Sequence, residues 1–368
     1  METTLDLKGQ FSVLLVFVTA FSICWCSKED VQTMDKEFRP IQGVEVLRAK
    51  IGSGPDEIGA IAPPEAAPIG PLSFALNKKE EIYILDQLNS RIQVFQNGKK
   101  MRTIPLPSDN FKDIALTPDG KIVLLDSDVQ KSLYILDSSG NVVNTLPLEG
   151  NLISNPLEVL WIQIVEKGKF AGIWVRVEDS SVRLASLEGN TTPRILAPGK
   201  FSIKGDRLLS SRILGEATAA VYRSEENSFS RWEPETTVFF NMYIVHILGL
   251  WDDERERIYL GAFLEDEDET GEKTYSNAII AFNPDGQELG RWKLFVQETP
   301  HEIWQPFRLS AEGHLYQLAI DNDDVVVLKY KIPLGYGKLM NKQQDVAPID
   351  AHAHLGEFPD LDSSLKPA

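Results

Sequence analysis

The chain has 368 residues, and its hydrophobic fraction of 43% is enough to bury the core of a large globular domain. It carries 54 Asp and Glu against 37 Lys and Arg, for a formal net charge of −17. This acidity excludes nucleic acid as an expected partner, and it disfavours attachment of the folded body to anionic lipid.

The amino-terminal segment 11–26 is apolar and uncharged, and it contains both cysteines of the chain, Cys24 and Cys26. It is shorter than the roughly 20 residues of a membrane span and fits the hydrophobic part of a signal peptide. We therefore predict a signal peptide or membrane anchor at 1–26, an extracytoplasmic protein, and membrane contact through this segment alone. A lipoprotein modified at Cys26 is an alternative, although Trp25 departs from the small residue expected there, and a buried core helix is another.

The next residues separate this segment from the folded body. Residues 27–42 are polar and unpatterned, which predicts a linker. Residues 43–52 alternate apolar and polar side chains as a half-buried strand does, and residues 52–71 are rich in Pro and Gly, as a loop is. With both cysteines upstream, a disulfide framework and a cysteine-based metal site are excluded from this body.

A unit of about forty residues is then repeated, a period typical of stacked or circular arrays. Residues 76–86 and 116–126 share the pattern of a turn followed by an apolar run ending in Asp. Each is followed by a second apolar run, a Gly turn and a third run that ends alike, at 103–106 and at 145–148. The apolar runs are nearly continuous, which is typical of strands covered on both faces.

Four more degenerate units follow, and the last contains only three strand-like runs before Pro333. The strand at 43–52 precedes the first complete unit and can supply the missing fourth strand. We therefore predict an all-β fold, a six-bladed β-propeller over 43–333 whose amino-terminal strand completes the last blade. A β-sandwich and an open solenoid are the alternatives. The four later units cover 156–197, 201–240, 244–295 and 306–332.

The first unit resembles the NHL repeat, in which a strand ending in Asp is followed by Asn, Arg-Ile and Val-Phe. The matching positions include Asp86, Asn89 and Arg91, whereas the second unit keeps Asp126 but lacks the Asn and the Arg. The resemblance implies an exported bacterial propeller that acts as a binding or scaffolding module. It also implies that Asp86, Asn89 and Arg91 are structural residues that knit adjacent strands.

Candidate catalytic residues are sparse. Metal-dependent propeller hydrolases of the gluconolactonase type hold a cation with a Glu, Asn and Asp set, and no such set recurs in matching strand contexts. Propeller lyases need paired histidines, but His246 is predicted to lie in a strand core, and His301 and His314 have no evident pairing. The acidic run 264–272 is predicted to be a solvated insertion between two strands, because its spacing does not fit a calcium loop.

The tail at 334–368 is predicted to be largely disordered. It contains Asp350, His352 and His354, a pattern similar to the first metal-binding strand of amidohydrolase barrels. Too little chain follows to build such a barrel, so we expect no catalysis from this motif.

We therefore predict a non-catalytic, monomeric propeller, without metal or cofactor, that binds a protein, peptide or glycan. The acidic surface favours a basic or neutral ligand. Trp251, Trp292 and Trp304 are the candidates for an aromatic ligand-binding face. The alternatives are a metal-dependent hydrolase of the lactonase type and a purely structural envelope module.

Overall fold

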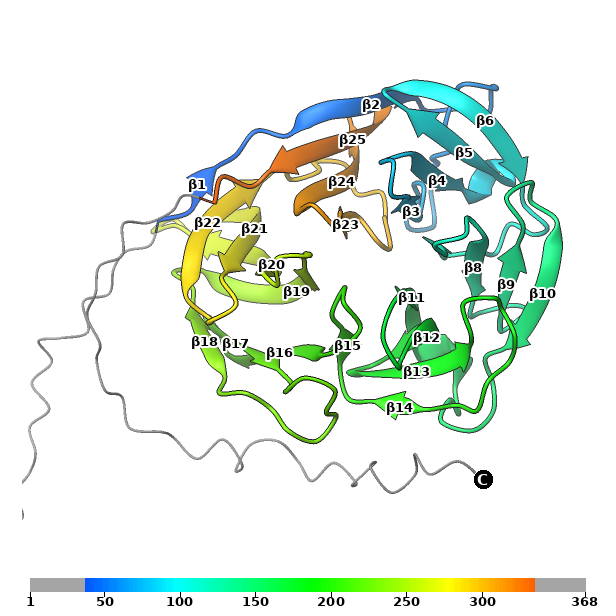
Figure 1. The fold of residues 1–368 in the computed structure, drawn as a ribbon. Coiled ribbons are helices and arrows are strands. Elements are labelled where there is room, and N and C mark those ends of the chain that lie inside the picture. Colours follow the sequence, from blue (N-terminus) through cyan, green and yellow to red (C-terminus); the bar gives the residue numbers. More distant parts are fainter. Residues whose placement is uncertain (1–36, 335–368) are drawn as a thin grey trace, which may run out of the picture. The chain divides into compact units, whose positions relative to one another are not determined.

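The computed structural model describes residues 37–334, and these fold into six sheets arranged as the blades of a propeller (Figure 1). Blades 1 to 5 each contain four consecutive antiparallel strands, and blade 6 contains three consecutive strands and one from the amino-terminal side. The first of the consecutive strands in each blade lies nearest the centre of the ring. The predicted all-β, six-bladed fold is confirmed. Regular helix in the described range is limited to two short 3₁₀ turns, η1 (Gln87–Asn89) and η2 (Pro156–Glu158).

The strand bounds follow the predicted repeat units. Blade 1 contains β3 (Ser73–Leu76), β4 (Ile82–Asp86), β5 (Arg91–Gln96) and β6 (Lys99–Pro105). Blade 2 contains β7 (Asp113–Leu116), β8 (Ile122–Asp126), β9 (Ser132–Leu136) and β10 (Val142–Pro147). Blade 3 contains β11 (Val159–Val165), β12 (Gly172–Val177), β13 (Ser180–Ala185) and β14 (Leu196–Ala197).

The other three blades complete the ring. Blade 4 contains β15 (Lys200–Phe201), β16 (Leu208–Gly215), β17 (Thr218–Arg223) and β18 (Thr236–Phe239). Blade 5 contains β19 (Tyr243–Asp252), β20 (Ile258–Glu267), β21 (Lys273–Phe282) and β22 (Glu288–Leu294). Blade 6 contains β23 (Phe307–Leu309), β24 (His314–Asp321), β25 (Asp324–Lys331) and the amino-terminal strand β2 (Val44–Lys50).

The ring is closed as the strand count predicted. β2 pairs with β25 in antiparallel register, and its Leu47 is 2% exposed in the core between blades 6 and 1. A further short strand, β1 (Arg39–Pro40), lies within the predicted linker and pairs in parallel with β22 of blade 5. The chain just before the ring therefore contacts blade 5, and β2 then completes blade 6.

The apolar runs form the cores between blades. All five residues of β4 and all five of β8 are buried, because each middle strand is covered by the neighbouring blade on both sides. The tight turns follow the predicted chemistry: Gly120 has a φ of +86°, and its N–H donates to the Thr117 carbonyl. Apolar runs and turns of this kind are what define the blades.

The ring has two faces, and we call the face at which the innermost strands begin the upper face. The turns between second and third strands also lie on the upper face, since neighbouring strands are antiparallel. The lower face holds the turns between first and second strands. None of the helices in the described range is long and apolar enough to cross a membrane. The predicted signal segment 1–26, and Asp350, His352 and His354 of the tail, lie outside the described residues.

Blade 5 differs from the others in strand length. β19, β20 and β21 have 10 residues each, whereas β4 and β5 of blade 1 have 5 and 6. Four to five extra residues at ~3.3 Å each make these strands roughly 15 Å longer than those of blade 1. They are also longer than the 8-residue strands β16, β24 and β25, which are the longest in the other blades. The expected solvated insertion at 264–272 is wrong in its first part, since residues 264–267 continue β20, whereas residues 268–272 form an exposed turn between the two strands.

Candidate functional site

The centre of the ring is lined by innermost strands, each with one edge that no further strand pairs. The backbone N–H and C=O groups along such an edge need other partners, because leaving them unpaired and buried is costly. Side chains from neighbouring blades supply these partners. Arg308 of β23 illustrates this: its Nε donates to the Phe74 carbonyl of β3 at 2.9 Å.

Asp113 of β7 connects four blades through one buried carboxylate, which is 0% exposed. Its Oδ1 accepts hydrogen bonds from the Ser73 hydroxyl at 2.6 Å and from Arg308 Nη2 at 2.7 Å. Its Oδ2 accepts from the N–H of Ile162 in β11 at 2.8 Å. Blades 6, 1, 2 and 3 are therefore joined at the centre by one charge-assisted network.

The connection continues from blade 3 to blade 5. Gln163 of β11 bonds both the N–H and the carbonyl of Phe201 in β15, at 3.1 and 2.7 Å. Lys200 Nζ donates to the Leu250 carbonyl of β19 at 2.8 Å, and the Asp252 carboxylate accepts the N–H of Ile203 at 3.0 Å. The polar residues of the centre thus serve blade-to-blade contacts.

Lys200 and Asp252 have perturbed ionisation, since both lie half-buried between the inner strands of blades 4 and 5. Burial lowers the pKa of Lys200 to about 8, although the Asp252 charge opposes the shift. Burial raises the pKa of Asp252 to about 7, although Lys200 opposes it. Perturbed pairs of this kind occur at functional sites and also in structural networks, so they do not identify a reaction by themselves.

The predicted tryptophans do not form one exposed face. Trp292 is 3% exposed and packs in the core of blades 5 and 6, so it is not available to a ligand. Trp251 is half-buried in the same core, edge-on to Phe307 with ring centroids 6.3 Å apart. Trp304 lies at the centre, where its Nε1 donates to the Leu160 carbonyl of blade 3 at 2.6 Å and Lys112 Nζ lies 4.7 Å from its ring.

The histidines are dispersed. His301 lies in the loop that leads into β23, and His314 follows the turn after β23, so their backbones lie on opposite faces and do not supply the pair a propeller lyase needs. His246 was predicted to lie in a strand core and is instead exposed. The register shift between Ile244 and His246 turns its ring onto the open side of blade 5.

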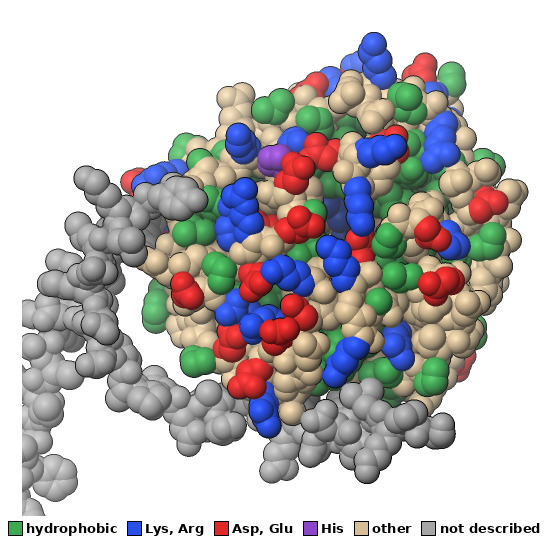
Figure 2. Space-filling view, in the orientation of Figure 1, with side chains coloured by type: hydrophobic (Ala, Val, Ile, Leu, Met, Phe, Trp, Pro, Cys, Tyr) green, Lys and Arg blue, Asp and Glu red, His purple; other side chains and the backbone are tan. Residues whose placement is uncertain are grey.

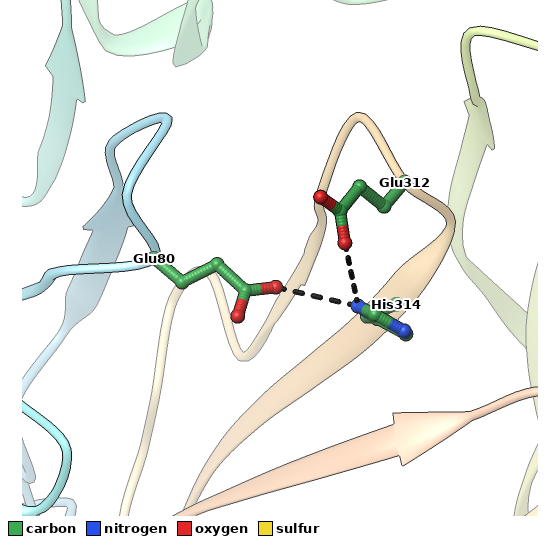
Figure 3. Close-up of side chains that lie close together, drawn as sticks. All are labelled: Glu80, Glu312 and His314. Carbon is green, nitrogen blue, oxygen red and sulfur yellow. Dashed lines mark hydrogen bonds and ion pairs between the residues drawn. The ribbon is translucent and has the colours of Figure 1, made fainter.

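One group of side chains has the spacing of a cation site. Glu80, Glu312 and His314 lie on the lower face with ligand atoms within 4.8 Å of one another (Figure 3). The ammonium group of Lys329 already pairs with this group, since its Nζ donates to both Glu80 oxygens, at 2.9 and 2.7 Å. These contacts lower the pKa of the Glu80 carboxyl, even though its burial opposes the change. The group is accounted for as a salt-bridge network between blades 1 and 6.

Opposite charges are intermingled in the view of Figure 2 over the middle of the ring. Ion pairs between turns of different blades on the lower face agree with this pattern, since Lys78 pairs with Glu166 at 2.8 Å and Lys204 pairs with Glu256. Among the described residues, Glu80, Glu312 and His314 are the one group of three or more His, Cys, Asp or Glu side chains with ligand atoms within 4.8 Å of one another.

The NHL-like residues fasten the long loop before blade 1. Asp86 accepts hydrogen bonds from the Gly59 N–H at 2.8 Å and from Arg91 Nε at 2.7 Å. Asn89 Nδ2 donates to the Gly52 carbonyl at 2.9 Å, and Arg91 Nη2 donates to the Gly54 carbonyl at 2.7 Å. These contacts join β4 and β5 to the segment 52–59.

The protruding hairpin of blade 5 presents a different surface, which we call the aromatic shelf: Tyr243, His246, Phe263 and Tyr275. The register places Tyr243, Glu265 and Tyr275 in one row and His246 and Phe263 in the next, so all lie on one face of the hairpin. The rings of Phe263 and Tyr275 stack at 5.4 Å and 5°, and those of His246 and Phe263 lie 5.3 Å apart. The other face, with Ile244 and Leu264, packs against blade 4.

The tyrosines of the shelf are exposed, and acidic side chains lie beside them. Tyr243 is 49% exposed and Tyr275 45%. The end of the hairpin, residues 265–273, carries six acidic residues against one Lys, and Glu265 in the middle of the shelf pairs with Lys273 at 2.7 Å. Sequence reasoning missed this surface, although the unusual length of the fifth unit was a signal for it. The six acidic residues are Glu265, Asp266, Glu267, Asp268, Glu269 and Glu272.

Comparison with known proteins adds little to this description. No family model and no curated protein matches the chain. Among solved structures, virginiamycin B lyase from Staphylococcus aureus matches with 11% identity over 72% of this chain and 95% of its own, at a TM-score of 0.39. Hsv2 from Kluyveromyces lactis matches with 13% identity over 67% and 70%, at 0.40, and a proposed gluconolactonase with 14% over 78% and 91%, at 0.41. At these scores, the matches do not bear on function.

Proposed function

We propose that the protein is a non-catalytic binding module whose ligand docks on the aromatic shelf of blade 5. The observation that carries the proposal is a continuous set of rings, in which three exposed rings surround the half-buried Phe263, on a hairpin that the propeller does not need for closure. Aromatic side chains supply contact area at low entropic cost and are enriched where proteins bind one another. The polar groups at the channel, in contrast, are engaged in contacts between blades.

The proposed ligand is a peptide segment of a protein partner that carries Lys or Arg. The charges of the hairpin favour it, since six acidic side chains lie beside the shelf with one Lys among them. A guanidinium or ammonium group over a Tyr or Phe ring gains cation–π attraction, and the carboxylates add long-range steering. The extracytoplasmic location remains a prediction that rests on the apolar segment 11–26.

The test uses a panel of fluorescent twelve-residue peptides, half with Arg and Lys at alternate positions and half with Gln in their place. We expect the basic peptides to bind at least about tenfold more tightly, with an affinity that falls as salt rises. Tyr275→Ala and Tyr243→Ala are expected to weaken binding about tenfold each, as interface aromatics do.

Met101→Ala is the matched control, because Met101 is 58% exposed on β6, the outer strand of blade 1, which does not adjoin blade 5. Equal loss in Met101→Ala and Tyr275→Ala would remove the shelf from the proposal. Binding of neutral glycans that Tyr275→Ala abolishes would replace the peptide by a sugar. A stoichiometric divalent ion in the purified protein would favour the metal-dependent hydrolase instead.

A further inference from the structure

The outer edge of the blade 5 hairpin is unpaired near the end of the hairpin. β21 pairs with β20 over its whole length, from Lys273 to Phe282, whereas its ladder with β22 begins only at Asn277. The chain after β22 turns away from this edge, since the N–H of Phe295 donates to the Tyr330 hydroxyl of blade 6 at 3.2 Å. No other strand among residues 37–334 pairs with this part of β21. The first four residues of β21 therefore form a sheet edge with one unpaired side.

The hairpin turns decide which backbone groups point to this edge. Successive residues of an antiparallel strand bond alternately to one neighbouring strand and to the other. At the turn between β20 and β21, the Asp268 N–H donates to the Glu272 carbonyl at 3.0 Å, so even-numbered residues of β21 bond to β20. The turn between β21 and β22 gives the same alternation. The N–H and C=O groups of Lys273 and Tyr275 therefore point to the unpaired side, and they have no hydrogen-bond partner within the described range.

The unpaired edge adjoins the aromatic shelf. Tyr275 belongs to both, since its ring lies on the shelf and its backbone lies on the edge. A strand added here would place every second side chain beside Tyr275 on the shelf face, where an Arg or Lys can lie over the ring. Glu265 and Glu267 stand opposite Tyr275 and Lys273 in β20, on the same face. The charges of this face therefore favour a basic strand.

The other edges of the blade 5 sheet are already paired. At its outer edge, β1 lies along β22, and the N–H of Ile41 donates to the Lys293 carbonyl at 3.1 Å. This sheet thus already holds one short extended segment from outside the blade. At the inner edge of the hairpin, the N–H of Ile244 in β19 donates to the Glu216 carbonyl of blade 4 at 2.7 Å. The start of β21 is therefore the edge of the hairpin that is open to a ligand.

We infer that a basic peptide segment of the partner binds as an extended strand along residues 273–276, with backbone hydrogen bonds to Lys273 and Tyr275. The inference rests on the proposed function, and it specifies the conformation of the ligand and the edge to which it binds. Each of the two residues offers one N–H and one C=O. Backbone bonds of this kind supply affinity in strand addition, and contacts of alternate side chains supply specificity.

The experiment replaces backbone amides of the tightest-binding basic peptide of the panel by N-methyl amides, one at a time. Each N-methyl group removes one donor and leaves the side chains unchanged. We expect at least about tenfold weaker binding at two positions that are two residues apart, because only alternate amides of a strand face its neighbour. N-methylation of the amide between them should change the affinity less than about twofold.

The outcomes of this scan separate the two proposals. A scan without the two-residue period, in a peptide whose binding Tyr275→Ala still weakens, would overturn strand addition and leave the shelf as the binding site. Absence of binding by every basic peptide would overturn both proposals. A wild-type dimer in sedimentation that Lys273→Pro dissociates would assign the edge to a second copy of the chain and overturn the inference.

Lys273→Pro tests the same edge from the side of the protein. Pro removes the N–H of residue 273, which points to the unpaired side, and edge strands tolerate Pro at such a position. Lys273→Ala is the matched control, since it also removes the ammonium group but keeps the N–H. We expect Lys273→Pro to bind the peptide at least about fivefold more weakly than Lys273→Ala, with Tm values that agree within about 3 °C. Equal affinities would contradict the inference, and the N-methyl scan decides if Lys273→Pro does not fold.

Discussion

The channel and the blade 5 hairpin contain the same kinds of side chain, and the protein uses them in opposite ways. In the channel, Arg308, Asp113 and Trp304 bond to backbone or side-chain groups of other blades. On the hairpin, Tyr243 and Tyr275 are about half exposed. The difference teaches that residue type does not identify a binding surface in this fold. A side chain is available to a ligand only where the neighbouring blades do not already bond to it or cover it.

The largest effect on stability is expected from replacing Asp113 in the channel. Asp113→Ala removes the acceptor of Ser73, of Arg308 and of the Ile162 N–H at once. Removing one partner of a buried charged pair typically costs about 3–5 kcal/mol, so we expect a decrease of that size in the free energy of unfolding. Urea denaturation followed by fluorescence measures it. A loss below about 1 kcal/mol would show that the network does not hold the blades together.

The ionisation of Lys200 gives a second test at the channel. The folded-state pKa of Lys200 is lowered to about 8 from 10.5, so the unfolded chain binds the extra proton between these values. Stability should therefore rise with pH from about 8 to about 10.5 by an amount that Lys200→Met abolishes. Tm measured against pH for both proteins decides this, and parallel curves would contradict it.

The pH dependence of stability expected from Asp252 has the opposite sign to that expected from Lys200. Its folded-state pKa is raised from 3.8 to about 7, so the folded protein binds the extra proton in this window. Stability from this group should fall as pH rises from about 4 to 7, and Asp252→Asn should remove that fall. The charges of Lys200, Asp253 and Asp206 also act on this carboxyl, so the comparison is made against the wild type at each pH. An unchanged slope would show that Asp252 does not titrate there.

The smallest effect on stability is expected at the shelf. Tyr243→Ala and Tyr275→Ala remove half-exposed rings from a hairpin that extends beyond the blade cores. We expect changes within about 0.5 kcal/mol in the free energy of unfolding, together with the loss of peptide binding described above. A loss above about 2 kcal/mol in the free energy of unfolding would mean that the shelf is part of the core. The hairpin would then have a structural role like that of the channel residues.

The sequence predicted the blades well and the site poorly, and particular residues show why. The turns at 117–121 and the apolar runs that follow them are local signals, and each was found in its expected place. Trp292 and His246 were both misjudged. The strand register of blade 5, with its shifts, decides which side of a strand faces a neighbour, and single residues do not encode it.

The sequence by itself determined the strand units, and six units with three strands in the last and one strand before the first predicted a closed ring. It determined this because apolar periodicity and turn chemistry act over a few residues. Only the tertiary structure decided which polar groups are engaged and which are free. The partners are far apart in the chain, as with Arg308 and Asp113, 195 residues apart, so their pairing exists only once the ring has closed.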